Sequence, residues 1–128
     1  MKVVIIMGSS SDEPHAKKIT DHLDILSIKW EQFVASAHKQ PLEVLKILEN
    51  NTGQDSLVYV TIAGRSNALS GFVGANSDFP TIACPPFTDK TDMLVNIHST
   101  LQMPSKTPVL TILDPGNCAT AISRIFKV

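Results

Sequence analysis

An excess of charge of either sign is missing from this sequence. Eleven Lys and Arg residues stand against 12 Asp and Glu residues, which leaves a formal net charge of -1. A chain of this kind has no basic field to collect nucleic acid or an anionic membrane surface by long-range attraction. We therefore expect no nucleic-acid partner, and any anion that the protein binds has to be held by local contacts.

Long apolar runs and clustered cysteines are missing too. The run from Val3 to Met7 is far too short to span a bilayer, and no signal-peptide cleavage site follows it. The two cysteines, Cys84 and Cys118, form no C-x-x-C or metal-type cluster, which argues against a disulfide framework or a zinc site. We expect a cytoplasmic protein with no membrane partner and no metal site.

The composition that remains is that of a globular protein. Hydrophobic residues make up 43% of the chain and charged residues 18%, which excludes disorder, collagen and coiled coil. A length of 128 residues is enough for one domain and too short for two of ordinary size. We find no repeat or linker and predict a single domain over residues 1–128.

Two kinds of apolar pattern alternate along the chain. Short β-branched apolar runs predict strands over residues 3–7, 28–35, 57–62, 81–84 and 109–113. Apolar residues spaced three or four apart predict helices over residues 13–26, 41–50, 70–76, 92–101 and 118–126. Alternating strands and helices predict an α/β fold, a three-layer αβα sandwich around a mostly parallel five-stranded sheet.

Local signals refine the first two helices. Ser11 or Asp12 is placed to cap the first helix with its side chain. Pro41 suits the first turn of the second helix. The apolar stripe of that second helix is expected from Leu42, Leu45 and Leu48.

Candidate ligand-binding segments follow from this fold class. In parallel α/β sheets, ligands bind at the carboxyl ends of the strands, near the point where the strand order reverses. In this sequence those ends are residues 8–12, 36–39, 63–67 and 84–86.

The first of these segments, Gly8-Ser9-Ser10-Ser11-Asp12, lacks the spacing of a dinucleotide-binding or ATP-binding loop. A glycine turn with three hydroxyls at a helix N-terminus still offers donors and a favourable dipole to one phosphate. Asp12 would repel that phosphate, so it is better placed on neutral hydroxyls such as those of a ribose. The alternative is that the segment only caps the helix.

His38 is the strongest candidate for acid–base chemistry, because it lies in a short loop at a strand end beside Lys39. An imidazole both takes and returns a proton near neutral pH, whereas a lysine supplies fixed positive charge. Such a lone histidine is otherwise an ordinary surface residue. His15, His22 and His98 have no clustered partner in the sequence, and only His15, near the expected phosphate site, is kept as a reserve candidate.

The segment Ala63-Gly64-Arg65-Ser66-Asn67 is rich in small residues and hydrogen-bond donors, which favours close approach of the backbone to a ligand. The alternative is a tight loop in which Arg65 pairs with a carboxylate. Small residues continue over 70–76 and predict a helix that packs closely on another element, with another subunit as one option.

Taken together, five segments resemble the aminoimidazole ribonucleotide carboxylase and mutase family of purine biosynthesis. They occur in the family's order and cover nearly the whole chain. The segments are Gly8-Ser9-Ser10-Ser11-Asp12, Ser36-Ala37-His38-Lys39, Ala63-Gly64-Arg65-Ser66-Asn67, Cys84-Pro85-Pro86 and Gln102-Met103-Pro104-Ser105.

The resemblance also separates two branches of that family. The mutase branch isomerises the N5-carboxylated ribonucleotide and carries a histidine at what looks like Ala68 here. Arg65-Ser66-Asn67 instead looks like the branch that carboxylates aminoimidazole ribonucleotide directly with CO2, as in the bifunctional animal enzyme. The resemblance therefore implies a carboxylase with a flavodoxin-like sheet, and it leaves the mutase as the alternative enzyme.

Residue roles follow from the same resemblance. It implies that Gly8, Ser9 and Ser11 bind the phosphate and Asp12 the ribose hydroxyls. It also places Ser36, Ala37 and Lys39 at the substrate, the first and last near the phosphate or ribose. His38 becomes the general acid and base, and Gly64, Arg65 and Ser66 border the imidazole and the CO2 pocket.

The partners implied are the ribonucleotide and CO2, with no cofactor: neither metal, biotin nor ATP. The resemblance further implies a homo-oligomer, a tetramer or an octamer, with Gln102 to Ser105 reaching toward a neighbouring site. Lys106 replaces a frequent glycine, and the end at Val128 suggests a smaller or weaker assembly. A different class also stays open, a flavodoxin-like module that holds FMN or a phosphorylated metabolite without turnover.

Overall fold

A five-stranded parallel sheet forms the centre of the computed structural model, which describes all 128 residues. Its strands are β1 (Lys2–Met7), β2 (Trp30–Val34), β3 (Leu57–Ile62), β4 (Thr81–Ala83) and β5 (Leu110–Thr111). Their order is β2-β1-β3-β4-β5, and every neighbouring pair is parallel. The predicted α/β fold is confirmed, with a sheet that is wholly rather than mostly parallel.

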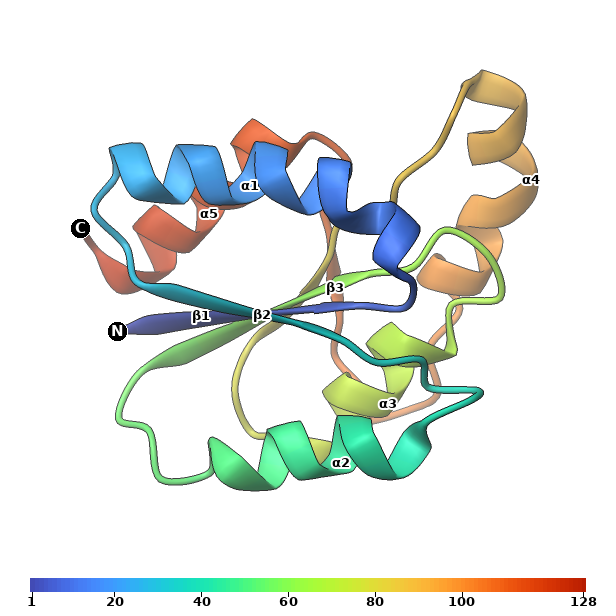
Figure 1. The fold of residues 1–128 in the computed structure, drawn as a ribbon. Coiled ribbons are helices and arrows are strands. Elements are labelled where there is room, and N and C mark those ends of the chain that lie inside the picture. The colour runs from blue at the N-terminus through green and yellow to red at the C-terminus, as the bar shows by residue number, and fades with distance from the viewer.

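Helices cover both faces of this sheet. They are a short 3-10 turn η1 (Ser10–Asp12), α1 (Glu13–Ile25), α2 (Pro41–Asn50), α3 (Ala68–Asn76), α4 (Lys90–Leu101) and α5 (Pro115–Phe126). Figure 1 shows α1 and α5 on one face and α2 and α3 on the other, while α4 projects beyond the carboxyl ends of the strands. None of these helices has the length and apolar character needed to cross a lipid bilayer.

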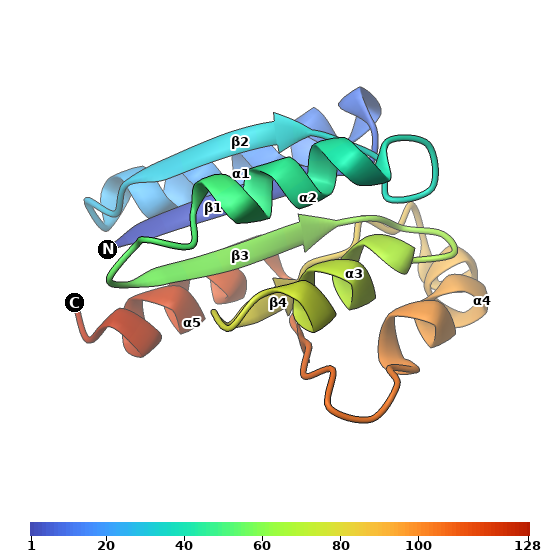
Figure 2. The same ribbon diagram turned by 90° about the horizontal axis from the view of Figure 1, so that it is seen from below.

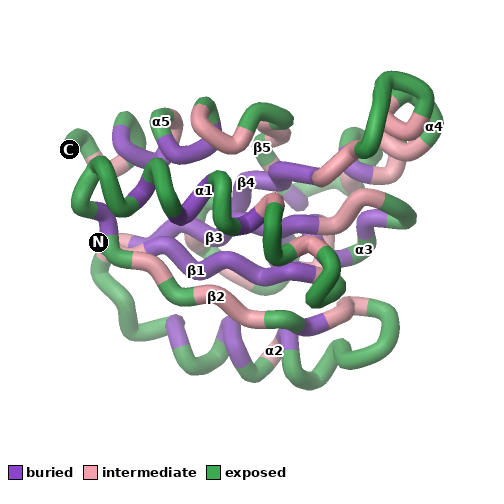
Figure 3. Tube along the Cα trace, turned by 45° about the horizontal axis from the view of Figure 1, so that its top comes forward, coloured by how far each residue is buried: buried purple, intermediate pink, exposed green.

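The core forms where each face of β1 meets its helices. Val3, Ile5 and Met7 belong to the cluster under α1 and α5, whereas Val4 and Ile6 belong to the cluster under α2 and α3. Successive side chains of a strand point to opposite faces, so a central strand buried on both sides reads as an unbroken apolar run. Figure 3 shows this continuous burial along β1 and β3. Each buried side chain of this size contributes about 1.5–3 kcal/mol.

The buried stripe of α2 differs from the predicted one. Val44, Ile47 and Leu48 are buried, whereas Leu42 is 78% exposed. Residues 44, 47 and 48 share a face at helical spacing, and the tertiary structure turns that face, which also carries the buried Asn51, toward the sheet. The prediction of Leu42 was therefore wrong, Leu45 is half-buried, and Leu48 was correctly placed.

The predicted cap of α1 is also corrected. Asp12 stands at the N-cap position, but its side chain makes no cap hydrogen bond. The side chain that caps is that of Ser9, whose Oγ accepts from the Ser11 amide at 3.3 Å and begins the short turn η1. The carboxylate of Asp12 is consequently left for another partner.

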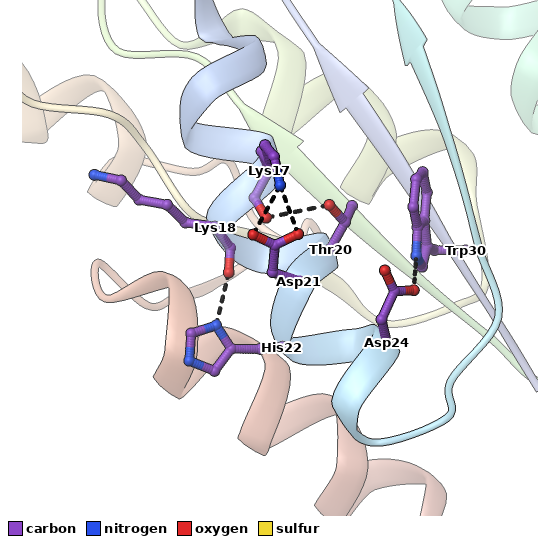
Figure 4. Close-up of polar contacts among 7 residues, drawn as sticks. All are labelled: Lys17, Lys18, Thr20, Asp21, His22, Asp24 and Trp30. Atoms are coloured by element: carbon purple, nitrogen blue, oxygen red, sulfur yellow. Dashed lines mark hydrogen bonds and ion pairs between the residues drawn. The ribbon is translucent and has the colours of Figure 1, made fainter.

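Polar side chains tie the outer face of α1 together (Figure 4). Lys17 pairs with Asp21, and the indole of Trp30 on the edge strand β2 donates to Asp24 at 2.7 Å. The ring of His22 stays on this face, with Nδ1 2.7 Å from the Lys18 carbonyl oxygen. His22 is thus an ordinary surface residue, as the sequence indicated.

The small-residue helix α3 packs on a segment of its own chain. A Cβ on Gly74 would lie 2.8 Å from the Val109 side chain, and one on Gly71 would lie 3.2 Å from Met103 Sδ. Figure 2 shows the segment that follows α4 returning past α3 toward β5. Close packing of this helix was predicted correctly, but the element that requires it at these two glycines belongs to the same chain.

Candidate active site

A cavity of about 340 Å³ opens at the carboxyl ends of the strands. It lies between the ends of β1 and β3, where the chain order along the sheet reverses. Crossovers on either side of such a point diverge, and this divergence leaves a crevice for a ligand. The lining residues are Gly8, Ser9, Asp12, Ala37, His38, Ala63, Gly64, Arg65, Ser66, Ala68, Leu69, Pro86, Thr88 and Asp92.

Most of the predicted site residues come together in this cavity. Those that line it are Gly8, Ser9, Asp12, Ala37, His38, Gly64, Arg65 and Ser66. Three predicted residues, Ser11, Ser36 and Lys39, do not line it. Three separate strand ends therefore contribute to one site, as expected for the edge of a parallel sheet.

The first wall is the segment after β1. The Gly8 amide donates to the Ile62 carbonyl at 3.0 Å and extends the pairing of β1 with β3 into the cavity floor. Ser11 is exposed and outside the cavity lining, and its Oγ lies 2.9 Å from Ser9 Oγ. Burial raises the pKa of Asp12 above the ordinary 3.8, against smaller opposing effects of the Ser9 backbone and of His15. This wall therefore brings the hydroxyl of Ser9 and the carboxylate of Asp12 to the cavity.

The second wall is the loop that carries His38. The backbone amide of Gln40 donates to the Ser36 carbonyl oxygen at 2.7 Å, and the backbone amide of Lys39 donates to Ser36 Oγ at 3.2 Å. These bonds close the loop around Ser36, so this side chain shapes the loop from outside the cavity. His38 is exposed and borders the cavity at the tip of this fixed turn, which suits a group that exchanges protons with a ligand.

The third wall, residues 63–67, contains a strained residue. Ser66 has a φ of 43°, in the left-handed region that costs a non-glycine residue about 1–2 kcal/mol. Strain of this kind persists where surrounding contacts hold it, and it is frequent at functional sites. The two ion pairs of the chain, Lys2–Glu31 and Lys17–Asp21, do not involve Arg65. Arg65 therefore makes no direct ion pair, although its positive charge helps to hold the pKa of Asp92 below its usual range, so the alternative of a carboxylate partner stays open.

Gly64 lets this wall approach the turn after β4. A Cβ at Gly64 would lie 2.8 Å from the carbonyl oxygen of Pro86, closer than carbon and oxygen approach without a shift of the backbone. The close approach seen here is to Pro86, whereas the predicted approach of this backbone to a ligand stays a prediction. The two backbones together form a narrow, uncharged corner of the cavity.

Ala63 and Pro86 fall within the predicted segments 63–67 and 84–86, and Ala68 was noted only as the position that separates the two branches, but sequence reasoning missed Leu69, Thr88 and Asp92. Thr88 and Asp92 carry the polar part of this set. The Asp89 side chain caps α4 by accepting from the Asp92 amide at 2.8 Å. Had Asp89 been recognised as an N-cap, the helix would have been predicted to begin two residues earlier. Thr88 and Asp92 would then have stood just before and within the first turn of the helix that follows β4. Hydrogen bonds from the Thr88 amide and from Asn96 hold the pKa of Asp92 below its usual range.

A contact between His15 and the buried Cys84 lies next to the turn after β4 that lines the cavity. Cys84, which precedes Pro85 and Pro86, has its Sγ 3.7 Å from His15 Nε2, and that nitrogen lies 3.0 Å from the Cys84 carbonyl oxygen. A hydrogen bond with Cys118 and the nearby His15 ring lower the pKa of the Cys84 thiol, although burial opposes this. The same pairing raises the pKa of Cys118. His15 thus supports the turn after β4 and does not line the cavity.

Known proteins match this chain over its whole length. The family described as AIR carboxylase matches residues 2–128. Phosphoribosylaminoimidazole carboxylase from Archaeoglobus fulgidus is 47% identical over all of this chain and 70% of its own length. The bifunctional phosphoribosylaminoimidazole carboxylase/phosphoribosylaminoimidazole succinocarboxamide synthetase of Drosophila melanogaster is 40% identical, over 97% of this chain and 29% of its own length.

The solved structures agree with the sequence matches. The crystal structure of Treponema denticola PurE superposes with a TM-score of 0.91 and 43% identity, and the match covers 98% of this chain and 80% of that one. The resemblance drawn from five short segments is thereby confirmed. With this cavity at the switch point of its sheet and matches of this extent, the chain belongs to the AIR carboxylase family.

Proposed function

We propose that this protein adds CO2 to C4 of 5-aminoimidazole ribonucleotide (AIR), giving 4-carboxy-5-aminoimidazole ribonucleotide in purine biosynthesis. The observation that carries the proposal is that one cavity gathers Asp12, His38 and Arg65 from the ends of three different strands. The carboxylate of Asp12 suits the hydroxyls of a sugar, and the imidazole of His38 suits proton transfer. The guanidinium of Arg65 suits a newly formed carboxylate.

The chemistry requires little from the protein beyond orientation and proton transfer. The aminoimidazole is an enamine, so its C4 already attacks the carbon of CO2 and forms the new carbon–carbon bond. C4 is then tetrahedral and loses its proton to recover aromaticity, and neutral His38 accepts that proton. Arg65, which makes no direct ion pair, lines the cavity and would bind the developing product carboxylate.

Substrate orientation follows from the walls. The phosphate lies against Gly8 and Ser9, where the Ser9 hydroxyl stands at the start of η1 and the helix dipole of α1 favours an anion. Asp12 accepts from the ribose hydroxyls. The imidazole then extends toward Gly64 and Ser66, and the corner between Gly64 and Pro86 holds CO2 away from water.

The carboxylase is favoured over the mutase by one position of the cavity. Ala68 lines the cavity at the first residue of α3. The resemblance places the additional histidine of the mutase at this residue. A methyl group there supplies no second proton carrier for transfer of a carboxylate from N5 to C4, so direct use of CO2 fits the site better.

The deciding experiment supplies the purified protein with AIR and CO2 in the absence of ATP. We expect 4-carboxy-5-aminoimidazole ribonucleotide to accumulate, with an initial burst when dissolved CO2 starts the reaction and a lag when bicarbonate does. Carbonic anhydrase is omitted, because it would merge the two time courses. Turnover of N5-carboxylated substrate without turnover of AIR would identify a mutase, and binding without turnover would identify a binding module.

Asp12 gives a prediction about nucleotide affinity. Asp12→Ala should weaken AIR binding by about 1–3 kcal/mol, because the ribose hydroxyls lose a charged acceptor. Only the carboxylate form accepts both hydroxyls, and burial raises the pKa of Asp12 above 3.8. The ratio of wild-type to variant affinity should therefore shrink on acidification, beginning at a higher pH than for an exposed aspartate.

Calorimetry at several pH values measures this ratio. Glu13→Ala removes the neighbouring carboxylate, which is exposed and outside the cavity lining, and serves as the matched control. Equal affinities of wild type and Asp12→Ala at neutral pH would contradict the proposed role of Asp12.

We further propose a cytoplasmic homo-oligomer, a tetramer or an octamer, that associates through α4. On this helix Leu94, Val95 and Leu101 are 64%, 68% and 56% exposed, an apolar surface that association would remove from water. Val95→Asp should shift the assembly toward smaller species in light scattering across a dilution series. Leu42→Asp places the same charge on an exposed residue of α2 and should leave the assembly intact. A wild-type monomer with full activity at the lowest concentrations would contradict the proposal.

A further inference from the structure

Helix α4 buries very little of its surface against the remainder of the chain for a helix of its length. Its one buried residue is Thr100, whereas α1 and α5 each bury four residues. Figure 1 shows α4 standing clear of the sheet that the other helices cover. Apolar burial therefore contributes little to its placement within the chain, and polar contacts must set its position.

These contacts converge on Asn67, which directly follows the strained Ser66. The backbone amide of Asn67 donates to Ser99 Oγ at 3.0 Å, and its side-chain Nδ2 donates to Thr100 Oγ1 at 2.9 Å. Asn67 and Thr100 are only 4% and 1% exposed. Inside a protein such bonds are electrostatically stronger than in water, and an unpaired member is costly. Asn67 and the last turn of α4 thus form one buried joint.

The joint is anchored to the sheet on its other side. Asn67 Oδ1 accepts from the Ser70 amide at 3.1 Å and from Ser70 Oγ at 3.0 Å. Ser70 Oγ lies 2.7 Å from Thr61 Oγ1 on β3. Since the single hydroxyl hydrogen of Ser70 is directed at Asn67, Thr61 donates to Ser70. The hydrogen bonds therefore run continuously from β3 through α3 to α4, and each of them has one donor and one acceptor.

The same helix reaches the cavity at its other end. Ser99 Oγ donates to the Asn96 carbonyl at 3.2 Å, and Asn96 Nδ2 donates to Asp92 Oδ1 at 2.6 Å. Asp92 lines the same cavity as Arg65 and Ser66 of the loop after β3. Movement of α4 would therefore displace two walls of the site together.

We propose that Asn67 and Thr100 are positioning residues of the carboxylation site, which hold Arg65 and Ser66 in place by joining their loop to α4. The inference rests on the proposed function. Arg65 and Ser66 are exposed, and the fixed points that follow them are the Ala68 amide on the Ser66 carbonyl at 2.7 Å and the bonds of Asn67. Without the joint, the loop loses the contact that holds Ser66 in its left-handed conformation.

The decisive variant is Thr100→Val, which keeps the shape of the side chain and removes the acceptor of Asn67 Nδ2. We expect kcat to fall roughly tenfold, because small misplacements of a reacting group reduce rates strongly. AIR affinity should stay within about twofold of wild type, because phosphate and ribose bind to the separate wall of Gly8 and Asp12. Thr100→Ser retains the hydroxyl and should restore most of kcat.

A matched control distinguishes positioning from general loss of stability. Thr20→Val makes the same change at a threonine that is 4% exposed, in the middle of α1, where its hydroxyl donates to the Lys17 carbonyl (Figure 4). It should lower the melting temperature without lowering kcat. If Thr100→Val does not fold, Ser99→Ala removes the acceptor of the Asn67 backbone amide at a less buried position and carries the same expectation.

A second readout does not depend on catalysis. The Asn67 and Ala68 amides should exchange with solvent deuterium at least tenfold faster in Thr100→Val than in wild type, and at wild-type rates in Thr20→Val. If the wild type does not carboxylate AIR, the proposed function fails while exchange still tests the joint. Wild-type kcat and wild-type exchange in folded Thr100→Val, or an equal loss of kcat in Thr20→Val, would overturn the inference.

Discussion

His38→Asn should lower kcat for AIR carboxylation by about 10²–10⁴-fold, the usual contribution of a positioned acid–base group. Asparagine is close to histidine in size but takes up no proton near neutral pH, so the tetrahedral intermediate keeps its C4 proton or returns CO2. The hydrogen bonds that close the 36–40 loop involve Ser36, Lys39 and Gln40 and not the His38 ring. The variant should therefore fold and bind AIR.

Steady-state kinetics with saturating AIR and CO2, together with calorimetric AIR binding, measures this effect. His22→Asn is the matched control, because His22 is an exposed histidine on the outer face of α1 and outside the cavity. Near-normal turnover of His38→Asn would show that another group removes the proton.

Gly64→Ala is the second change for which we expect a large effect. The added methyl group would lie 2.8 Å from the backbone oxygen of Pro86, so the loops after β3 and β4 must separate. A misplacement of about 1 Å between reacting groups costs about 10²-fold in rate. Forced overpacking costs about 1–3 kcal/mol of stability. Both kcat and the free energy of unfolding should therefore fall.

Gly53→Ala provides the control for this change. No atom lies within 4 Å of a Cβ at Gly53, and its φ is not positive, so the substitution should leave activity and stability near wild type. Denaturant unfolding and AIR carboxylation assays on the two variants decide the matter. If Gly64→Ala keeps wild-type turnover, the corner between Gly64 and Pro86 is not the place where CO2 binds.

Patterns local in the sequence predicted the elements of this fold well. β1 and β3 read as unbroken apolar runs because each is buried on both faces, and their predicted ranges match the structure to within one residue. Edge strands were harder, since residues 109–113 include only two that pair, Leu110 and Thr111. Pairing depends on the neighbouring strand, and an apolar run does not show where that neighbour ends.

The stripe of α2 shows a second limit of local pattern. Leu42, Leu45 and Leu48 are as compatible with helical spacing as Val44, Ile47 and Leu48. The buried set is chosen by the angle at which the helix lies on the sheet, and that angle depends on contacts with other elements.

The sequence by itself determined where chemistry gathers in this protein. In a parallel sheet all strand ends meet at one edge, so strand order along the chain already brings residues 8–12, 37–38 and 63–66 toward a common cavity. Gly8, Asp12, His38 and Arg65 were accessible to this reasoning because each directly follows a recognisable strand.

Only the tertiary structure decided which residues support that site. Asp92 faces the cavity because α4 starts at the Asp89 cap, and His15 lies against Cys84, 69 positions away in the chain. The joint of Asn67 with Thr100 spans 33 positions. Such contacts depend on the relative placement of whole helices, which the summed packing of the sheet sets, and a single threonine in an amphipathic pattern carries no sign of its distant partner.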